Sequence, residues 1–243
     1  MNSLIMPLLN ILFPKDCQHC GDNFKAGLSN ILCLKCFNSL KPYEDPVCDH
    51  CGASLPIRAF EDSAIYRCRD CGDEPYYLDQ VRAFGVYEGA LRIAHHSFKF
   101  EGMENFKSEI VGKMMGNTPE TFWSGVEALV PIPQSPEKER ERGYNPAVLL
   151  GEELSKATRI SLVNLVEKIN PTQPQMSLTR EERFKNPKGA YQVGEGVTLP
   201  RKLVLVDDVF TTGSTLEECA RVLKKAGVEW VGAIVFGRTP RHF

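Results

Sequence analysis

The stretch that decides the fold is LVLVDDVFTTGST, residues 203–215. Its four leading apolar residues predict a buried central strand. Asp207 and Asp208 follow at the carboxyl end of that strand, which is where open α/β sheets bind their ligands. The small residues after them open a helix, and backbone N–H groups at a helix N-terminus favour an anion. We predict a phosphate loop made of Thr211, Thr212, Gly213, Ser214 and Thr215.

The paired carboxylates indicate what accompanies the phosphate. Asp207 and Asp208 carry negative charge, so they repel a phosphate and do not bind it directly. Carboxylates suit hydroxyl groups, such as those of a ribose, or an Mg²⁺ ion that bridges to the ligand. The sequence therefore predicts a ligand that combines a phosphate monoester with a sugar.

Strands and helices alternate on both sides of this stretch. We predict strands at 81–86, 126–132, 201–208 and 229–236, and helices at 90–100, 105–115, 147–157 and 215–226. Continuous apolar runs are typical of buried parallel strands. The pattern predicts an α/β fold: a twisted, mostly parallel sheet with helices on both faces. Residues 168–200 are polar and contain several prolines and glycines, which predicts a long loop.

Eight of the nine cysteines lie before residue 72, in four Cys-x-x-Cys pairs. Two such pairs complete a closed tetrahedral site, so we predict two structural Zn²⁺ sites, formed by sequential pairing. A thioredoxin-like redox pair needs a βαβ context, and iron–sulfur clusters usually have tighter spacings; these two remain the alternatives. The eight predicted ligands are Cys17, Cys20, Cys33, Cys36, Cys48, Cys51, Cys68 and Cys71.

Composition and charge exclude several protein classes. The chain has 243 residues, of which 42% are hydrophobic, so disorder is excluded as its overall state. No apolar run reaches about 18 residues, and we expect no membrane span. Cysteines arranged as metal ligands indicate a reducing, cytoplasmic location. Each zinc–thiolate site adds −2, so two sites take the formal charge from −2 to −6, which argues against a basic nucleic-acid wrapper.

We divide the chain into three parts: an amphipathic N-terminal helix at 1–14, a double zinc ribbon at 15–75 and the α/β domain at 78–243. Leu4, Leu8, Ile11 and Leu12 form the apolar stripe of the first part. We expect this helix to pack on its own protein, and a partner or a membrane surface is the alternative. The N-terminus lacks the charged region of a signal peptide.

The phosphate loop resembles the phosphoribosyl pyrophosphate (PRPP) signature of the type I phosphoribosyltransferases, and the whole chain resembles the ComF/GntX family. That family joins a cysteine module to a phosphoribosyltransferase-like domain in the order found here. Three further segments carry the resemblance: FKFEG at 98–102, VPIPQSPEKERERGYNPA at 130–147 and TQPQMSLTREERFKNPKGAY at 172–191. Pro146 departs from the pattern, because the family more often has glutamine there.

The resemblance implies a role for each of these segments. PRPP, bound with Mg²⁺, is the implied ligand, with its 5-phosphate in the phosphate loop and its ribose 2- and 3-hydroxyls facing the two aspartates. The implied pyrophosphate loop contains Arg140, Arg142 and Gly143, with Lys99 as a further candidate. Arg180 and Arg183 lie on the loop that the family closes over its site. From the residues alone, a solvated charged loop at 138–142 and a surface lysine at 99 are the alternatives.

At the level of function, the resemblance implies a PRPP-binding competence factor that handles incoming single-stranded DNA during natural transformation. Single-stranded DNA or DNA-uptake proteins are the implied partners. An active phosphoribosyltransferase with an unidentified small acceptor is the alternative, and a nucleotide sensor that docks another protein is a third. The residues themselves support DNA binding weakly: basic clusters occur at 180–188, 201–202 and 221–225, without interleaved aromatic residues.

Three residues of reactive type are interpreted as structural. His95 and His96 have no cysteine or carboxylate at ligand spacing along the chain. Cys219 lies in the helix after the phosphate loop, at a position expected to face the core.

Overall fold

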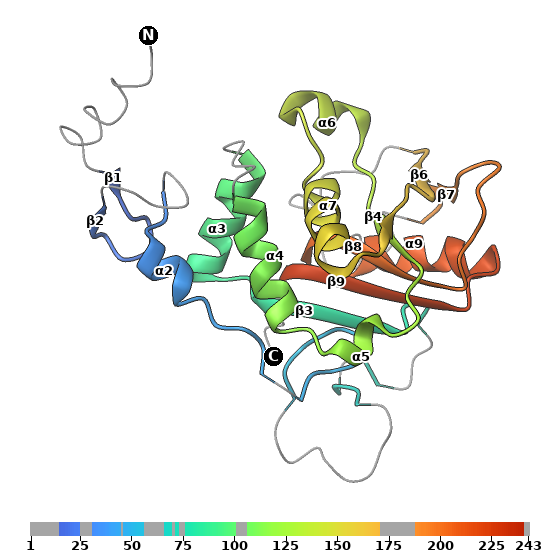
Figure 1. Cartoon of the computed structure of the whole chain (residues 1–243), viewed down its shortest axis with the longest axis horizontal. Helices are drawn as coiled ribbons and strands as arrows, with labels where there is room; N and C mark the ends of the chain where they lie inside the picture. Colours follow the sequence, from blue (N-terminus) through green and yellow to red (C-terminus); the bar gives the residue numbers. More distant parts are fainter. Residues whose placement is uncertain are drawn as a thin grey trace.

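The computed structural model describes residues 15–24, 31–44, 46–55, 66–69, 71–72, 76–100, 106–170 and 188–240. Its centre is a five-stranded sheet with the order β3-β9-β8-β4-β5, in which every neighbouring pair is parallel (Figure 1). The strands are β3 (Gln80–Val86), β4 (Ala128–Pro131), β5 (Ser161–Leu162), β8 (Lys202–Phe210) and β9 (Trp230–Arg238). The predicted parallel sheet is confirmed.

Strand β8 shows why these residues form a central strand. Successive side chains of a strand point to opposite faces. Leu203 and Leu205 pack in the core on one face, and Val204 and Val206 pack in the core on the other. All four are fully buried, so the apolar run at the start of the deciding stretch fills both cores at once.

Helices cover both faces of the sheet, as predicted. One face carries α3 (Gly89–Phe100), α4 (Lys107–Gly116) and α7 (Pro146–Thr158), and the other carries α9 (Ser214–Lys225). The short α5 (Glu120–Trp123) precedes β4. Cys219 on α9 is fully buried, so its interpretation as a core residue is confirmed. Within the described residues, the structure has no helix with the length and apolar character that a bilayer crossing requires.

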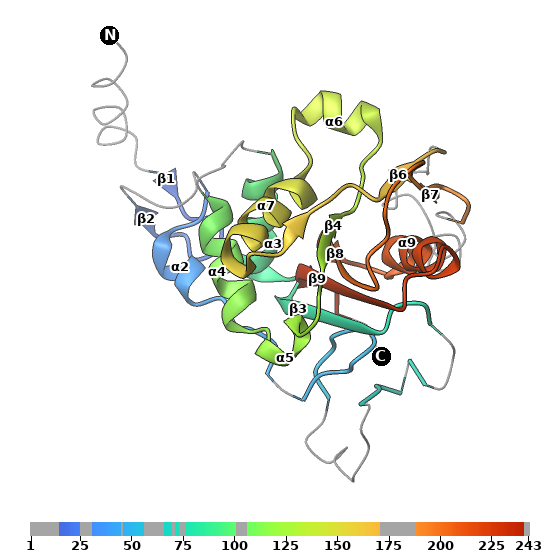
Figure 2. The same ribbon diagram turned by 45° about the vertical axis from the view of Figure 1, so that its right-hand side comes forward.

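The segment 136–142 corrects one expectation. It forms a helix, α6 (Pro136–Arg142), where we predicted a loop. Proline at the first turn, glutamates near the start and arginines near the end all favour a helix, and Gly143 ends it in the left-handed conformation, with φ 83°. Figures 1 and 2 show α6 standing away from the sheet, in the connection between β4 and α7.

The prediction that residues 168–200 form one long loop is also wrong in part, because this range includes residues of two short strands. Val166–Lys168 (β6) and Tyr191–Val193 (β7) pair as a short antiparallel ribbon. The ribbon is tied to α9, because the Gly189 N–H donates to Glu218 Oε1 at 2.7 Å. Three-residue strands are too short to show a clear alternation in a polar segment. Arg180 and Arg183, like the predicted helix at 1–14, lie outside the described residues.

The cysteine module borders the β3 edge of the sheet (Figure 2). It begins with the hairpin of β1 (Lys15–Asp16) and β2 (Asn23–Phe24), followed by α2 (Leu34–Asn38). The first four cysteines lie on the α3 and α4 side of the sheet, and the second four lie on the α9 side. The chain between them bonds to β3, where Tyr43 N donates to Phe84 O at 2.6 Å and Val81 N donates to Asp49 O at 2.8 Å. The module therefore shares both cores with the sheet.

Candidate functional site

The two predicted aspartates lie at the carboxyl end of β8, beside α3. Asp208 is 9% exposed and Asp207 is half-buried, and the Asp208 N–H donates to Asp207 Oδ1 at 2.8 Å. Lys99 Nζ on α3 lies 2.9 Å from Asp208 Oδ2. The sequence proposed Lys99 as a ligand for an anion, and the structure places its ammonium group on the carboxylate instead. A ligand anion bound beside Asp208 would find this lysine within reach.

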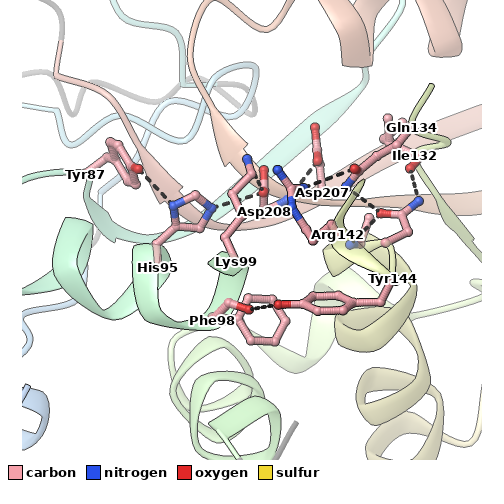
Figure 3. A network of polar contacts seen from close by, with 12 residues as sticks. Tyr87, His95, Phe98, Lys99, Ile132, Gln134, Arg142, Tyr144, Asp207 and Asp208 are labelled. Atoms are coloured by element: carbon pink, nitrogen blue, oxygen red, sulfur yellow. Dashed lines mark hydrogen bonds and ion pairs between the residues drawn. The ribbon is translucent and has the colours of Figure 1, made fainter. Parts of the chain in front are cut away.

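His95 belongs to the same cluster (Figure 3). Its Nε2 lies 3.0 Å from Asp208 Oδ2, and its Nδ1 lies 2.8 Å from the Tyr87 hydroxyl. The ring of His95 thus contacts a candidate site carboxylate, and its interpretation as structural stays a prediction. The sequence offered no signal for this contact, since the two residues lie on different elements far apart along the chain. The interpretation of His96, which is exposed, stays a prediction.

The neighbours of the two carboxylates push their pKa values apart. Burial alone would raise the pKa of Asp208, but His95 and Lys99 hold it well below its usual range. Burial and the charge of Asp208 raise the pKa of Asp207 to about 8. At neutral pH the pair thus holds one carboxylate and one carboxylic acid. Such a pair can accept one hydrogen bond and donate another, which suits two neighbouring hydroxyl groups.

A pH experiment tests the raised pKa of Asp207. The unfolded value is about 3.9, so this group contributes stability that is complete below pH ~4 and is lost as the pH rises through about 8. Asp207→Asn should remove this dependence, because an amide does not titrate. We expect the melting temperature of the variant, relative to that of the unmodified chain, to be higher at pH 9 than at pH 5. Melting curves at both pH values check this, and equal differences would contradict the raised pKa.

Gly213 fixes the predicted phosphate loop to the end of β8. It is the residue before α9 and has φ +79°, a conformation that side chains disfavour. A Cβ built on it would overlap the ring of Phe210. Thr212 Oγ1 and Ser214 Oγ lie 2.8 Å apart, and the Glu217 N–H donates to the Gly213 carbonyl to begin the helix. The loop is a tight turn that leads directly into the N-terminus of α9.

The connection from β4 to α7 contributes further polar side chains beside the aspartate pair. Arg142 Nη1 donates to Gln134 Oε1 at 3.1 Å, and Gln134 Nε2 donates to Asn145 Oδ1 at 3.1 Å (Figure 3). Asn145 also donates to the Ile132 carbonyl and caps α7. Pro146 occupies the first position of α7, where a missing N–H costs nothing. Pro146, where the family more often has glutamine, is therefore compatible with the start of α7. The side-chain amides of this region belong to Gln134 and Asn145.

The structure brings some of the predicted residues together and separates others. Figure 3 shows Lys99, Arg142, Asp207 and Asp208 in one group. Arg140 is exposed, and its Nε donates to the Pro136 carbonyl of its own helix. Arg140 therefore does not join the group in this structure. The group missed by sequence reasoning consists of Tyr87, His95, Gln134 and Asn145.

The eight cysteines form two groups of four, as sequential pairing predicts. In each group the sulfur atoms lie within 4.8 Å of one another, and none of the cysteines forms a disulfide. A zinc–sulfur distance of about 2.3 Å places tetrahedral sulfurs roughly 3.8 Å apart. Cys20 and Cys33 Sγ atoms lie 3.9 Å apart, and those of Cys51 and Cys68 lie 3.7 Å apart. The donor sets therefore fit two zinc sites of the closed, structural type, each with four cysteine ligands.

Backbone donors support thiolates in both groups. Cys33 N lies 3.4 Å from Cys17 Sγ, and Cys68 N lies 3.3 Å from Cys48 Sγ. Although burial raises the pKa of Cys17, N–H groups from Cys33, Cys20 and His19 lower it to about 6. A thiolate is the form that binds zinc.

Removing one ligand should cost one metal ion. We expect Cys33→Ser to retain about one zinc per chain instead of two, and to melt at a lower temperature, because structural zinc stabilises the fold that it closes. Cys219→Ala is the matched control, since Cys219 is buried but lies outside both groups, and it should retain both ions. Metal analysis of the purified variants checks this, and two zinc ions in Cys33→Ser would contradict the assignment.

Comparison with known proteins gives matches over both parts of the chain. Residues 8–73 match the double zinc ribbon domain, and residues 142–241 match the phosphoribosyl transferase domain. Competence protein F of Haemophilus influenzae is 32% identical, over 88% of this chain and 92% of that protein. Competence protein ComFC of Bacillus subtilis is 30% identical, over 81% and 79%. DNA utilization protein YhgH of Escherichia coli K12 is 32% identical, over 86% and 90%.

Proposed function

The chain belongs to the ComF/ComFC family of competence proteins, and from this premise we propose that it binds PRPP with Mg²⁺ and acts in the handling of incoming single-stranded DNA. The parallel sheet is of the phosphoribosyltransferase type, and the N-terminal module carries two four-cysteine zinc sites. The proposal adds a ligand and a cellular role to this architecture.

One observation carries the proposal for PRPP. A pair of carboxylates with opposite protonation preferences is followed, within five residues, by the tight turn at Gly213 and the N-terminus of α9. PRPP presents matching groups: two neighbouring ribose hydroxyls and a 5-phosphate on the same sugar. In this arrangement the aspartates bind the hydroxyls, and the phosphate loop binds the phosphate.

The positive side chains of the group suit the remaining part of PRPP. Lys99 and Arg142 come from opposite sides of the aspartate pair and supply charge for a pyrophosphate. Asp207 and Asp208 are the residues suited to Mg²⁺, because it prefers oxygen ligands. When bound, that ion neutralises pyrophosphate charge. Arg180 and Arg183 stay proposed ligands of the same anion.

Calorimetric titration tests this proposal. We expect saturable binding of PRPP in the presence of Mg²⁺ and weaker binding of ribose 5-phosphate, which offers the same phosphate and hydroxyls without the pyrophosphate. Absence of heat with PRPP at millimolar concentration would sink the proposal. A screen of small acceptors for pyrophosphate release then separates a binding protein from an active phosphoribosyltransferase.

The DNA role is supported by the relatives rather than by surface charge. Of the predicted basic clusters, those at 201–202 and 221–225 are described, and three of their cations are paired: Arg201 with Glu229, Arg221 with Glu218, and Lys224 with Asp79. Paired cations contribute less to a phosphate backbone contact. Salt-dependent binding to a single-stranded oligonucleotide at low salt is the expected result. Failure of that assay removes the DNA role and leaves the PRPP proposal intact.

The zinc-ligating cysteines favour a reducing compartment for the protein. Eight thiols that serve as zinc ligands need protection from oxidation to disulfides. We therefore propose the cytoplasm as its location, which fractionation of cells followed by immunoblotting tests.

A further inference from the structure

Arg238, the last residue of β9, is a buried cation that none of the roles above uses. Its side chain is 3% exposed. Its Nη2 donates to Cys51 Sγ at 3.4 Å, and its Nη1 donates to the Thr239 carbonyl at 3.3 Å. Its Nε has no hydrogen-bond partner in the part of the chain that the structure describes. A guanidinium that has left water in this way needs an anion beside it.

The second zinc site supplies that anion. Cys48, Cys51 and Cys71 are 0% exposed, so the charge of the site is screened little by solvent. Four thiolates around one zinc ion carry a net charge of −2. The guanidinium of Arg238 contacts one of these four sulfurs directly. The zinc-loaded site therefore compensates for the burial of this guanidinium.

The other side of Arg238 reaches the phosphate loop. Arg238 pairs in register with Phe210, and its guanidinium lies 5.8 Å from the centre of the Phe210 ring. The next residue, Thr239, donates from its N–H to the Phe210 carbonyl and from Oγ1 to the Thr211 carbonyl at 3.1 Å. Because the Phe210 ring packs against Gly213, this strand end fixes the backbone from which the loop starts.

A second contact joins the same two regions. His50 lies between Cys48 and Cys51, and its Nε2 is 3.4 Å from Glu217 Oε1 in the first turn of α9. The Glu217 N–H donates to the Gly213 carbonyl at 2.8 Å. The second zinc site is thus linked to the two ends of the phosphate loop region, through Arg238 to Phe210 and through His50 to Glu217.

We propose that Arg238 is a positioning residue that couples the second zinc site to the phosphate loop. Zinc holds the guanidinium in place, and the end of β9 at residues 238–239 holds Phe210 and Thr211, through the contact with the Phe210 ring and the hydrogen bonds of Thr239. Loss of zinc from this site loosens the loop and weakens the binding of a phosphate-bearing ligand, and by reciprocity the bound ligand strengthens the binding of this zinc ion. The ligand part of the inference rests on the proposed binding of PRPP, and the zinc and loop parts do not.

The experiment uses the full-length, zinc-loaded protein and the variants Arg238→Met and Arg238→Lys. Methionine removes the charge with similar length, and lysine keeps the charge. Three quantities are measured: release of zinc to a chelator without PRPP, amide hydrogen exchange at residues 209–217 without PRPP, and affinity for PRPP with Mg²⁺. Arg92→Met, on the exposed face of α3, is the control.

For Arg238→Met we expect the affinity for one of the two zinc ions to fall by about tenfold, as when other residues bonded to a metal ligand are lost, and its release to the chelator to be correspondingly faster. Exchange at 209–217 should rise, and affinity for PRPP should fall by about the same factor. Arg238→Lys should restore most of the zinc retention, because the ammonium still faces the thiolates. If Arg238→Met does not fold, Arg238→Lys alone must show intermediate values of all three quantities.

The outcomes separate the two proposals. Unchanged zinc release and unchanged exchange in Arg238→Met would overturn the coupling. Faster zinc release with unchanged loop exchange would overturn it too, because Arg238 would then serve the zinc site alone. If the unmodified chain fails to bind PRPP while release and exchange both rise, the coupling stands and the proposed function fails.

Discussion

The double variant Asp207→Asn, Asp208→Asn is expected to show no measurable binding of PRPP while keeping two zinc ions and a folded sheet. Both substitutions keep the size of the side chain; Asp208→Asn removes a negative charge, and Asp207→Asn replaces a carboxylic acid. Loss of one hydrogen bond to a charged group and one to a neutral group costs about 2–4.5 kcal/mol, which is roughly thirtyfold or more in affinity. The metal sites should be unaffected, because neither aspartate belongs to a cysteine group.

The single variants should differ, because the two carboxylates have different surroundings. Asp208→Asn leaves Lys99 and His95 without their carboxylate, so it should lower the melting temperature as well as the affinity. Asp207→Asn should lower affinity without that loss of stability. Calorimetric titration and thermal melting of each variant measure the two effects.

Asp79→Asn is the matched control for these variants. Asp79 is also an aspartate at a strand end, but it lies at the opposite edge of the sheet, where its Oδ2 accepts from Val231 N at 2.7 Å. This control should bind PRPP normally even though it loses the charge that pairs with Lys224. Normal PRPP affinity in the double variant, or equal losses in the control, would show that the carboxyl edge of β8 is not the site.

The parts of the fold that could be predicted are those encoded by local pattern. The run at 203–206 is apolar at every position because the strand is buried on both faces. The segment 136–142 was missed because its helix buries no residue and therefore has no apolar stripe. The β6–β7 ribbon was missed because each strand has three residues.

The residues of the site also divide into those that a local sequence pattern predicts and those that it does not. Asp207, Asp208 and the cysteines were predictable because each set is adjacent in sequence or spaced by two residues. Lys99 and Asp208, which form an ion pair, are separated by 109 positions, and Cys51 and Arg238 are separated by 187. Such contacts follow from strand order, because β3, β9 and β8 lie side by side, and strand order is not visible in one sequence.

Gly213→Ala should be among the most damaging single substitutions outside the metal sites. It adds two separate costs: an alanine at φ +79°, about 1–2 kcal/mol, and a methyl group that collides with the ring of Phe210, about 1–3 kcal/mol more. The melting temperature should fall by roughly 2–4 °C for each kcal/mol. PRPP affinity should fall at least about tenfold, because displacement of the ring moves the start of the phosphate loop.

Gly196→Ala separates the two costs. Gly196 has φ +68° with nothing within 4 Å of the built Cβ, so its substitution carries the backbone cost without the collision. The control should therefore lose about 1–2 kcal/mol of stability and keep its PRPP affinity. Phe210→Leu combined with Gly213→Ala should be less destabilised than the sum of the two single changes, because a smaller side chain makes room for the methyl group. Strict additivity, or equal loss of stability in Gly196→Ala and Gly213→Ala, would show that packing of Gly213 on Phe210 does not shape the loop.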